Sequence, residues 1–294
     1  MLFSPAAIAF IAVAIVVLPV IQRPVVAAEI LVLGIAAVAM NLLIGYTGML
    51  SFGQAMFFGI SAYITGILVT KAGVSAFVAI PVAVVATGVV AALVGAFCVR
   101  RSGLYFICIT FAFNQMFYFI AYSWTSVTGG EDGLPGIARP AIIADPISFY
   151  VFTAAVFVAA LAVLKKIVDS PTGRILQAIR DNPNRAAATG HDVGRYKLVA
   201  FVVAGAMGGL AGALLVNHTE FVTPEFMHWT RSGEIMFMVI LGGMGTLVGP
   251  VLGAAMALGT VFALVVLFFR TGVIGVVEAG YERFRRQREK PANP

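Results

Sequence analysis

The sequence predicts an all-α integral membrane protein with about eight transmembrane helices. Of its 294 residues, 61% are hydrophobic and only 11% are charged. Soluble domains contain about 25% charged and about 45–50% apolar residues. Several apolar stretches approach or exceed about 18 residues, which indicates membrane-spanning helices rather than barrel strands. We expect a single polytopic membrane domain over residues 1–294.

The basic residues predict which parts of the chain face the cytoplasm. Many of the 19 lysines and arginines lie between Lys165 and Lys197 or between Arg283 and Lys290. Cytoplasmic loops of membrane proteins are enriched in these residues. Topology therefore explains the net charge of +6 better than nucleic-acid binding does. We expect a cytoplasmic loop at about 169–196 and a basic cytoplasmic tail at about 279–294.

Apolar runs and the loops between them give the expected order of spans. The predicted spans are about 6–22, 25–44, 77–99, 103–124, 148–168 and 197–217, with a glycine-broken segment between the second and third. Region 233–269 is predicted as one crossing plus a re-entrant half-helix, which leaves the tail inside. Residues 6–18 also resemble the apolar core of a signal peptide, with 26–28 as a cleavage site. No basic residue precedes that run, which favours an uncleaved helix.

The first glycine-broken segment, residues 42–63, is apolar enough for a bilayer but unusually rich in glycine and polar groups. Non-helical backbone at membrane depth survives only where protein covers it or where it lines a cavity. We therefore predict that this segment is broken or re-entrant and lines a translocation path. The residues assigned to that path are Gly45, Tyr46, Thr47, Gly48, Ser51, Gly53 and Gln54.

A second segment, residues 239–253, repeats this glycine spacing near the end of the chain. Paired glycine- or proline-interrupted segments in two halves of a chain are typical of a transporter's central site. The alternative is that the glycines only allow helices to pack closely. The residues assigned to the path here are Gly242, Gly243, Gly245, Thr246 and Gly249.

The residues that could carry chemistry favour a protein that is not an enzyme. The histidines lack metal-ligand spacing, and Cys98 and Cys108 lie in apolar surroundings without a CxxC pattern, so we predict no metal site. The chain contains no GxxxxGK[ST] loop and no convincing Ser/His/Asp or Cys/His set. The spans also lack a chain of Asp, Glu and His, which weakens the case for a proton-driven machine.

Four blocks of sequence, in order over residues 41–254, carry a resemblance to a known family. They are NLLIGYTGMLSFGQAMFFGISAY from Asn41, LYFICITFAFNQMFYFIAYSW from Leu104 with TGGEDGLPGIARP after it, GRILQAIRDNPNRAAATGHDVGRYKLVAFVVAGAMGGLAGAL from Gly173, and PEFMHWTRSGEIMFMVILGGMGTLVGPVLGA from Pro224. These blocks resemble permease subunits of branched-chain amino-acid ABC importers, and the GEDGLPG loop is similar to the M-type, or second, permease subunit.

The resemblance implies a set of partners and a location. The partners are a second permease subunit, two cytoplasmic ATP-binding subunits and a periplasmic substrate-binding protein, all at a bacterial inner membrane. This chain would hold no cofactor, because the partner subunits bind the ATP. The cytoplasmic loop would be the segment that docks on the ATPase. The residues implied are Gly173, Arg174, Arg180, Asp181, Asn182, Ala186, Ala187 and Gly190.

The function expected from these observations is that of a permease subunit in an ATP-driven importer of branched-chain or other small hydrophobic amino acids. Related permeases carry urea, amides or aromatic acids, so these substrates stay open. The alternative from another class is an ion-coupled secondary transporter that acts alone, because broken helices suit such carriers as well.

Overall fold

The computed structural model describes Pro19 and residues 23–268. The elements in chain order are α2 (Pro24–Thr47), α3 (Gln54–Thr70), α4 (Ala76–Cys98), α5 (Leu104–Ser123), α6 (Thr125–Thr128), η1 (Gly130–Asp132), β1 (Leu134–Pro135), η2 (Ala141–Ile143), α7 (Pro146–Asp169), α8 (Pro171–Asp181), α9 (Pro183–Ala188), α10 (Val193–Thr219), β2 (Phe221–Val222), η3 (Pro224–Met227), α11 (Trp229–Gly242) and α12 (Gly249–Phe268). Contacts divide the chain into two compact units, residues 1–254 and 255–294.

Long apolar helices dominate the described part of the chain. Five helices there, α2, α4, α5, α7 and α10, are long and apolar enough to cross a membrane. The chain is therefore an all-α, multi-pass membrane protein. Except for Pro19, the predicted span at 6–22 lies outside the described residues, as does the predicted tail at 279–294. The total of about eight spans stays a prediction.

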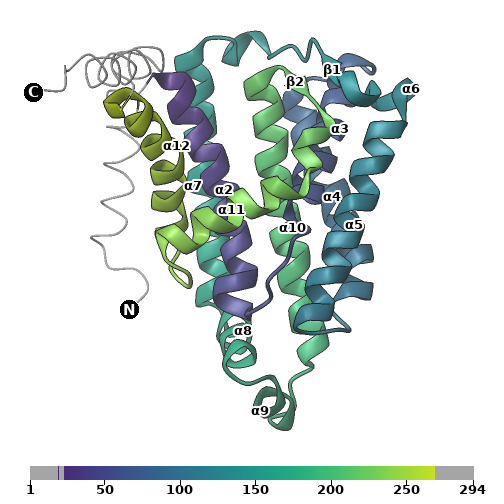
Figure 1. Cartoon of the computed structure of the whole chain (residues 1–294), viewed down its shortest axis with the longest axis vertical. Helices are drawn as coiled ribbons and strands as arrows, with labels where there is room; N and C mark the ends of the chain where they lie inside the picture. The colour runs from purple at the N-terminus through teal and green to yellow at the C-terminus, as the bar shows by residue number, and fades with distance from the viewer. Residues whose placement is uncertain (1–18, 20–22, 269–294) are drawn as a thin grey trace, which may run out of the picture. The chain divides into compact units, whose positions relative to one another are not determined.

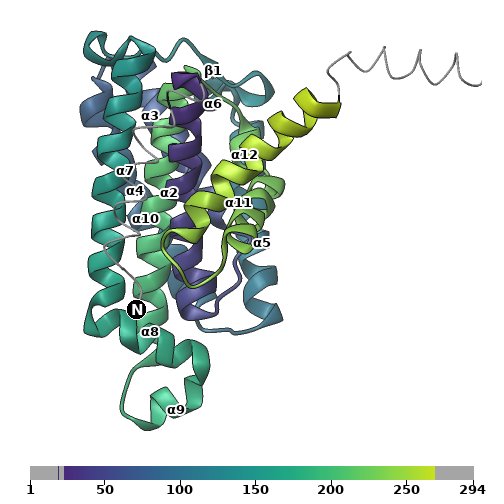
Figure 2. The same ribbon diagram turned by 90° about the vertical axis from the view of Figure 1, so that its left-hand side faces the viewer.

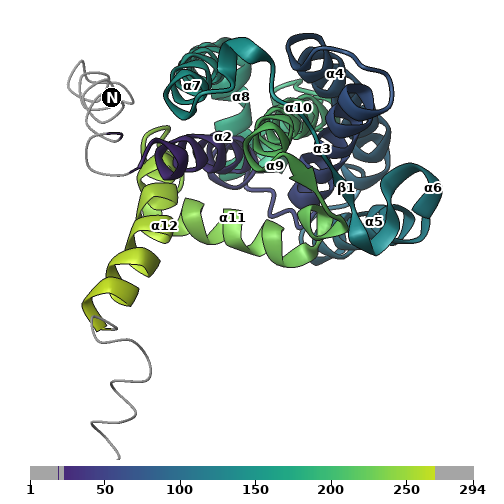
Figure 3. The ribbon, with the colours of Figure 1, turned by 90° about the horizontal axis from the view of Figure 1, so that it is seen from above.

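Helix α10 lies at the centre of the first unit. It contacts α2, α3 and α4 along its length, and a view from above places it among these helices and α7 (Figure 3). Small residues make this close packing possible. A Cβ atom at Gly212 would collide with the carbonyl oxygen of Phe58 in α3, and one at Gly205 would lie 2.6 Å from the Cβ of Ala91 in α4.

The two ends of the first unit differ in structure. At one end, α8 and α9 project beyond α7 and α10 (Figure 2). At the opposite end, β1 and β2 form a short antiparallel pair, in which Leu134 is opposite Val222 (Figure 1). This pair is the small exception to the predicted all-α fold.

Helix α11 is too short to cross a membrane in the usual way. It has 14 residues, which corresponds to about 21 Å at 1.5 Å per residue, against a hydrocarbon core of about 30 Å. It crosses the front of α2 in Figure 1 instead of running parallel to it. The 233–269 region therefore contains a short helix, a break and the start of α12, and its membrane topology stays a prediction.

Candidate translocation and coupling site

The first glycine-broken segment contains a non-helical linker between α2 and α3. Helix α2 ends at Thr47, and Gly48 has a left-handed backbone with φ of 69°. The amides of Gly48 and Met49 both donate to the carbonyl of Leu43, the pattern of a glycine-capped helix end. The chain then runs back into the bundle without helical structure until α3 begins at Gln54 (Figure 1).

Side chains from two other helices satisfy the backbone of this linker. Ser232 of α11 donates to the carbonyl of Phe52 at 2.8 Å and accepts from the amide of Ala55 at 2.8 Å. Thr110 of α5 accepts from the amide of Phe52 at 3.3 Å. Within the linker, the Ser51 hydroxyl accepts from the amide of Gly53 at 3.1 Å. The interruption is thus covered by protein, as non-helical backbone at membrane depth requires.

The second glycine-broken segment separates α11 from α12. Gly243 and Gly245 have φ values of 101° and 79°, a region of backbone conformation that favours glycine. Thr246 stabilises the turn, because its hydroxyl donates to the carbonyl of Gly243 at 3.0 Å. The same hydroxyl accepts from the amide of Gly249 at 3.1 Å, at the start of α12.

The two interruptions meet at Asn41 and Gly45 of α2. The Asn41 amide nitrogen donates to the carbonyl of Thr246 at 2.6 Å, and its oxygen accepts from the amide of Gly245 at 2.9 Å. Asn41 is completely buried. A Cβ atom at Gly45 would lie 2.5 Å from the nitrogen of Gly245, so the two backbones are in direct contact.

Arg180 of α8 reaches this meeting point from the predicted ATPase-docking loop. Its guanidinium donates to the carbonyl of Gly45. Its Cγ would lie 3.1 Å from a Cβ atom at Gly48, and its Nη1 would lie 3.5 Å from one at Gly245. The same guanidinium pairs with Asp181 at 3.4 Å. One arginine therefore contacts the first interruption and lies beside the second.

The predicted docking loop folds into two capped helices. Ser170 accepts from the amide of Gly173 at 3.4 Å, at the start of α8. A Cβ atom at Gly173 would collide with the carbonyl of Val168, so only glycine lets α8 pack this close to the end of α7. Asn182 ends α8 and accepts from the amide of Arg185 at 3.0 Å, which caps α9.

The remaining residues assigned to docking differ in burial. Ala186 is buried, whereas Arg174, Asp181 and Ala187 are exposed. Gly190 has φ of 86°, a left-handed backbone that follows α9.

The structure does not bring all the predicted path residues together. Gly45, Gly48 and Gly245 gather around Arg180, and Gly242 packs against Gly249 across the second break. Gln54 lies apart: its side chain is buried, faces Gly208 of α10, and has no partner in the described part of the chain for either amide atom.

Tyr46 and Thr47 are also buried, but their hydroxyl groups differ in hydrogen bonding. The Thr47 hydroxyl donates to the carbonyl of Leu42, so it serves its own helix. The Tyr46 hydroxyl has no partner among the described residues.

The residues assigned to the path did not include three polar residues that hold the interruptions in place, namely Asn41, Thr110 and Ser232. Asn41 was recognisable as a polar residue within an apolar span, but its role needed knowledge of a contact about 200 positions away in the sequence. Thr110 and Ser232 gave no such signal. In the part of the chain that the structure describes, no group of His, Cys, Asp or Glu could hold a metal ion.

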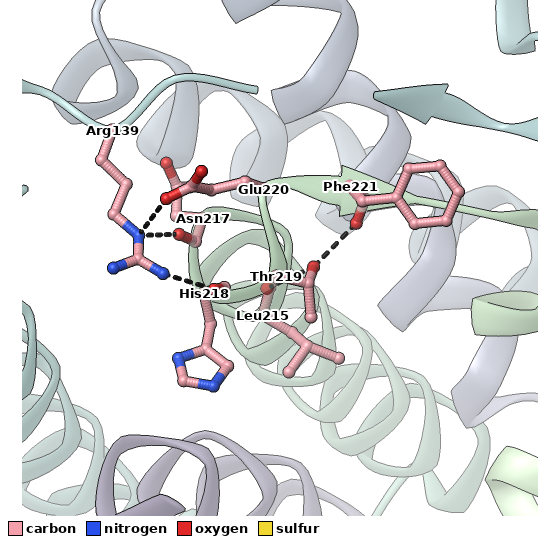
Figure 4. A network of polar contacts seen from close by, with 7 residues as sticks. All are labelled: Arg139, Leu215, Asn217, His218, Thr219, Glu220 and Phe221. Atoms are coloured by element: carbon pink, nitrogen blue, oxygen red, sulfur yellow. Dashed lines mark hydrogen bonds and ion pairs between the residues drawn. The ribbon is translucent and has the colours of Figure 1, made fainter. Parts of the chain in front are cut away.

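Arg139 forms a second arginine contact, which Figure 4 shows from close by. It lies in the loop after β1, and β1 is at the end of the unit opposite α8 (Figure 1). Its guanidinium donates to the carbonyls of Asn217 and His218 at the end of α10. It pairs with Glu220 at 3.2 Å and lies 4.7 Å from the ring centre of Phe149 in α7. Cations are favoured at a helix C-terminus, because the last carbonyls lack helical partners. Arg139 therefore fastens the loop after α5 to α10.

Broken helices, a covered linker and a buried contact between two interruptions are features of membrane transport proteins rather than of simple membrane anchors. Comparison with known families agrees. The chain belongs to the family described as branched-chain amino acid transport system / permease component, whose model matches residues 24–277. This family consists of transport permeases, not of enzymes.

Three curated relatives carry related names. The high-affinity branched-chain amino acid transport system permease protein LivM of Salmonella typhimurium is 26% identical over 249 residues, covering 76% of this chain and 59% of the relative. LivM of Escherichia coli strain K12 is 26% identical over 247 residues, covering 75% and 58%. A probable branched-chain amino acid transport permease protein LivM of Methanocaldococcus jannaschii is 24% identical over 256 residues, covering 74% of each chain.

The match thus spans about three fifths of the length of the first two relatives. No solved structure matches the chain.

Proposed function

We propose that this chain is a permease subunit of an ATP-driven importer for branched-chain or other small hydrophobic amino acids. A second permease subunit would complete the path, two cytoplasmic subunits would bind ATP, and a periplasmic protein would deliver the substrate. Family membership and the names of the relatives support this proposal. The observation that carries it is the contact of Arg180 with Gly45, where the two interruptions meet.

The proposed orientation places α8 and α9 in the cytoplasm of a bacterial inner membrane. The end of the unit that bears α8 also carries Arg100 and Arg101 after α4, and Lys165 and Lys166 at the end of α7. An excess of lysine and arginine is typical of the cytoplasmic side. The loop at the opposite end contains Glu131, Asp132 and Asp145, which suits the outer side.

The mechanism follows from the chain of contacts. Docking of an ATPase on residues 173–190 would move α8, and Arg180 would carry that movement to the carbonyl of Gly45. Asn41 would transmit the movement to the second interruption, because its side-chain amide is hydrogen-bonded to the backbone of Gly245 and Thr246. Coupling of this kind requires an element with two arrangements that both partners bias. The interruptions are suited to be that element, because their backbone is not fixed by a helical ladder.

The test compares two arginine variants in the assembled importer. Arg180→Ala removes the contact with Gly45, whereas Arg195→Ala removes an exposed arginine whose described ion pair is to Asp192 on the same loop. A hydrogen bond to a charged group contributes about 1.5–3 kcal/mol, so loss of coupling should lower uptake by about tenfold or more. Uptake of radiolabelled leucine and ATP hydrolysis are measured in the same liposomes.

We expect Arg180→Ala to hydrolyse ATP with little uptake, and Arg195→Ala to resemble the unchanged protein. Equal uptake in both variants would remove Arg180 from the mechanism. Reconstitution of this chain without the ATPases gives a separate check. Uptake driven by an ion gradient alone would contradict the importer and favour a secondary transporter. Ligand binding by the cognate periplasmic protein identifies the substrate.

A further inference from the structure

The end of the unit that bears α8 holds a cavity of about 250 Å³ with three cations in its wall. Arg101 lies in the loop before α5, Arg180 in α8, and Lys197 in the first turns of α10. Thr47 and Gly48 close the wall from the end of α2. The residues that line the cavity in the described structure include no carboxylate. A cavity whose wall carries charge of one sign concentrates ions of the opposite sign.

Two of these cations have no ion pair of their own. Within the described part of the chain, the ion pairs do not involve Arg101 or Lys197, and Lys197 is half-buried. Among the described residues, Arg180 forms an ion pair with its neighbour Asp181 at 3.4 Å, and it also donates to the carbonyl of Gly45. Arg101 and Arg180 are exposed, so the burial cost applies to Lys197. Holding this half-buried charge without an ion pair is unfavourable, and a bound anion would offset that cost.

The start of α5 adds a feature suited to a phosphate group. This helix of 20 residues begins at Leu104, and no side chain caps its first turn. Gly103, Phe106 and Ile107 line the cavity, so the helix start lies at its edge. Unpaired amides and the helix dipole favour phosphate at a helix N-terminus. Together with the three cations, this helix start has the chemistry that suits a compact oxyanion.

The surroundings of the cavity favour a lipid as the source of that anion. Leu104 and Tyr105 beside it are each 75% exposed, so apolar surface continues from the cavity along α5. The proposed orientation, which belongs to the proposed function, places the cavity at the inner surface of the membrane. Basic pockets between helices on that side are suited to the headgroups of anionic lipids.

We propose that this cavity binds a phosphate-bearing anion, supplied in the membrane by the headgroup of an anionic phospholipid. The phosphate bridges Arg180 to Arg101 and Lys197, and it thereby holds α8 against the end of α2. Because Arg180 also contacts Gly45, the bound lipid stabilises the junction through which the ATPases would act. Lipid binding therefore regulates how freely the junction moves.

The test uses the full chain purified with phosphatidylcholine and titrated with phosphatidylglycerol of the same acyl chains. The apparent Tm is the readout, and inorganic phosphate replaces the lipid in a second arm. The double variant R101Q/K197Q removes two cations from the cavity. The matched control R100Q/K166Q removes two exposed cations at the same end of the unit that do not line the cavity. The assay needs neither ATPase nor substrate, so its outcome does not depend on the proposed transport function.

We expect phosphatidylglycerol to raise the apparent Tm of the unchanged chain and of R100Q/K166Q at the same concentrations. At about 1 kcal/mol for each cation near a membrane surface, R101Q/K197Q should need about 30-fold more of this lipid. Lys197→Gln alone should need about fivefold more phosphatidylglycerol for the same rise in Tm. This single variant replaces the double variant in the test if the double variant does not fold in phosphatidylcholine.

The other outcomes separate the sources of the anion. An equal response to inorganic phosphate supports the phosphate site but assigns it to a free ion instead of a lipid. An equal response in R101Q/K197Q and R100Q/K166Q overturns the proposal. Co-purification with the ATPases is then measured separately. If R101Q/K197Q keeps the full lipid response but no longer co-purifies, the cavity is a docking surface for protein.

Discussion

Gly45 lies where the backbone of α2 approaches the backbone of the second interruption too closely for a side chain to fit. A Cβ atom at this position would lie 2.5 Å from the nitrogen of Gly245 and would also collide with the side chain of Asn41. The carbonyl of the same residue accepts the hydrogen bond from Arg180. At the residue scale, Gly45 therefore contacts both interruptions and α8 of the predicted docking loop without contributing a side chain.

Gly45→Ala should push the second interruption away from α2. Overpacking of this kind costs about 1–3 kcal/mol, so we expect a lower apparent Tm and reduced uptake by the assembled importer. Gly233→Ala in α11 is the matched control, because a Cβ atom there meets nothing within 4 Å. If both variants keep full stability and uptake, the close contact between the two interruptions has no role in the mechanism.

The pair α8 and α9 is suited to transmit force because each helix has a defined start. Ser170 caps the start of α8 and Asn182 caps the start of α9, each by accepting a hydrogen bond from a backbone amide. Leu176, Ile179 and Ala186 are buried, so the pair packs on the unit instead of moving freely in solution. At the element scale, the caps keep Arg180 in register with Gly45.

Asn182→Ala should loosen α9, because loss of an N-cap costs about 0.5–2 kcal/mol. Trypsin cleavage after Arg185, which lies in the first turn of α9, measures the loosened fraction. We expect cleavage to become several-fold faster, since proteolysis follows the population of the open form. Asn182→Asp keeps a capping oxygen and should be cleaved at the original rate. Equal cleavage of both variants would show that the cap does not hold α9.

At the scale of the whole first unit, an arginine binds helix carbonyls at each end. Arg180 contacts α2 at the end that bears α8, and Arg139 contacts the last turn of α10 at the other (Figure 4). Helices α2 and α10 pack against each other along the unit, so the two contacts are linked through rigid elements.

Arg139→Ala should release the loop between α5 and α7 from the end of α10. It leaves the carbonyls of Asn217 and His218 without this donor, at a cost of about 1.5–3 kcal/mol. We expect the apparent Tm to fall by roughly 3–12 °C. Hydrogen exchange should accelerate at the amide of Ile137, which donates to the carbonyl of Glu220 at 3.2 Å.

The control for Arg139 is Arg231→Ala, which breaks a partly exposed ion pair with Glu234 at 2.9 Å. Such pairs contribute about 0–1 kcal/mol, so its effect should be much smaller. A loss of stability as large as that of Arg139→Ala would show that Arg139 has no special function at this end.

Much of the fold could be predicted from local patterns. Composition identified an all-α membrane protein, and the apolar runs predicted the spans now seen as α2, α4, α5, α7 and α10. Local signals also mark the short helix in the predicted docking loop, because Pro183 begins α9 and Gly190 follows its end, which are positions that favour these residues. These features depend on residues that are close together in the chain.

The candidate site could be predicted only in part. Glycine spacing indicated two breaks, and the polar residues near them were assigned to one path. The structure gathers Gly45, Gly48 and Gly245 but leaves Gln54 against α10, because the direction in which α3 leaves the first break decides which way that side chain points. The direction of α3 depends on packing between helices, so it could not be predicted from residues near Gln54 in the sequence.

The sequence by itself determined that this chain lies in a membrane, where its helices break, and to which family it belongs. The tertiary structure decided that the two breaks meet at Asn41 and that Arg180 reaches them from the docking loop. The physical reason is the range of the interactions involved. Hydropathy, proline and glycine act within one helix, whereas these hydrogen bonds join residues separated by 135 to 205 positions. Such contacts exist only after the helices have packed.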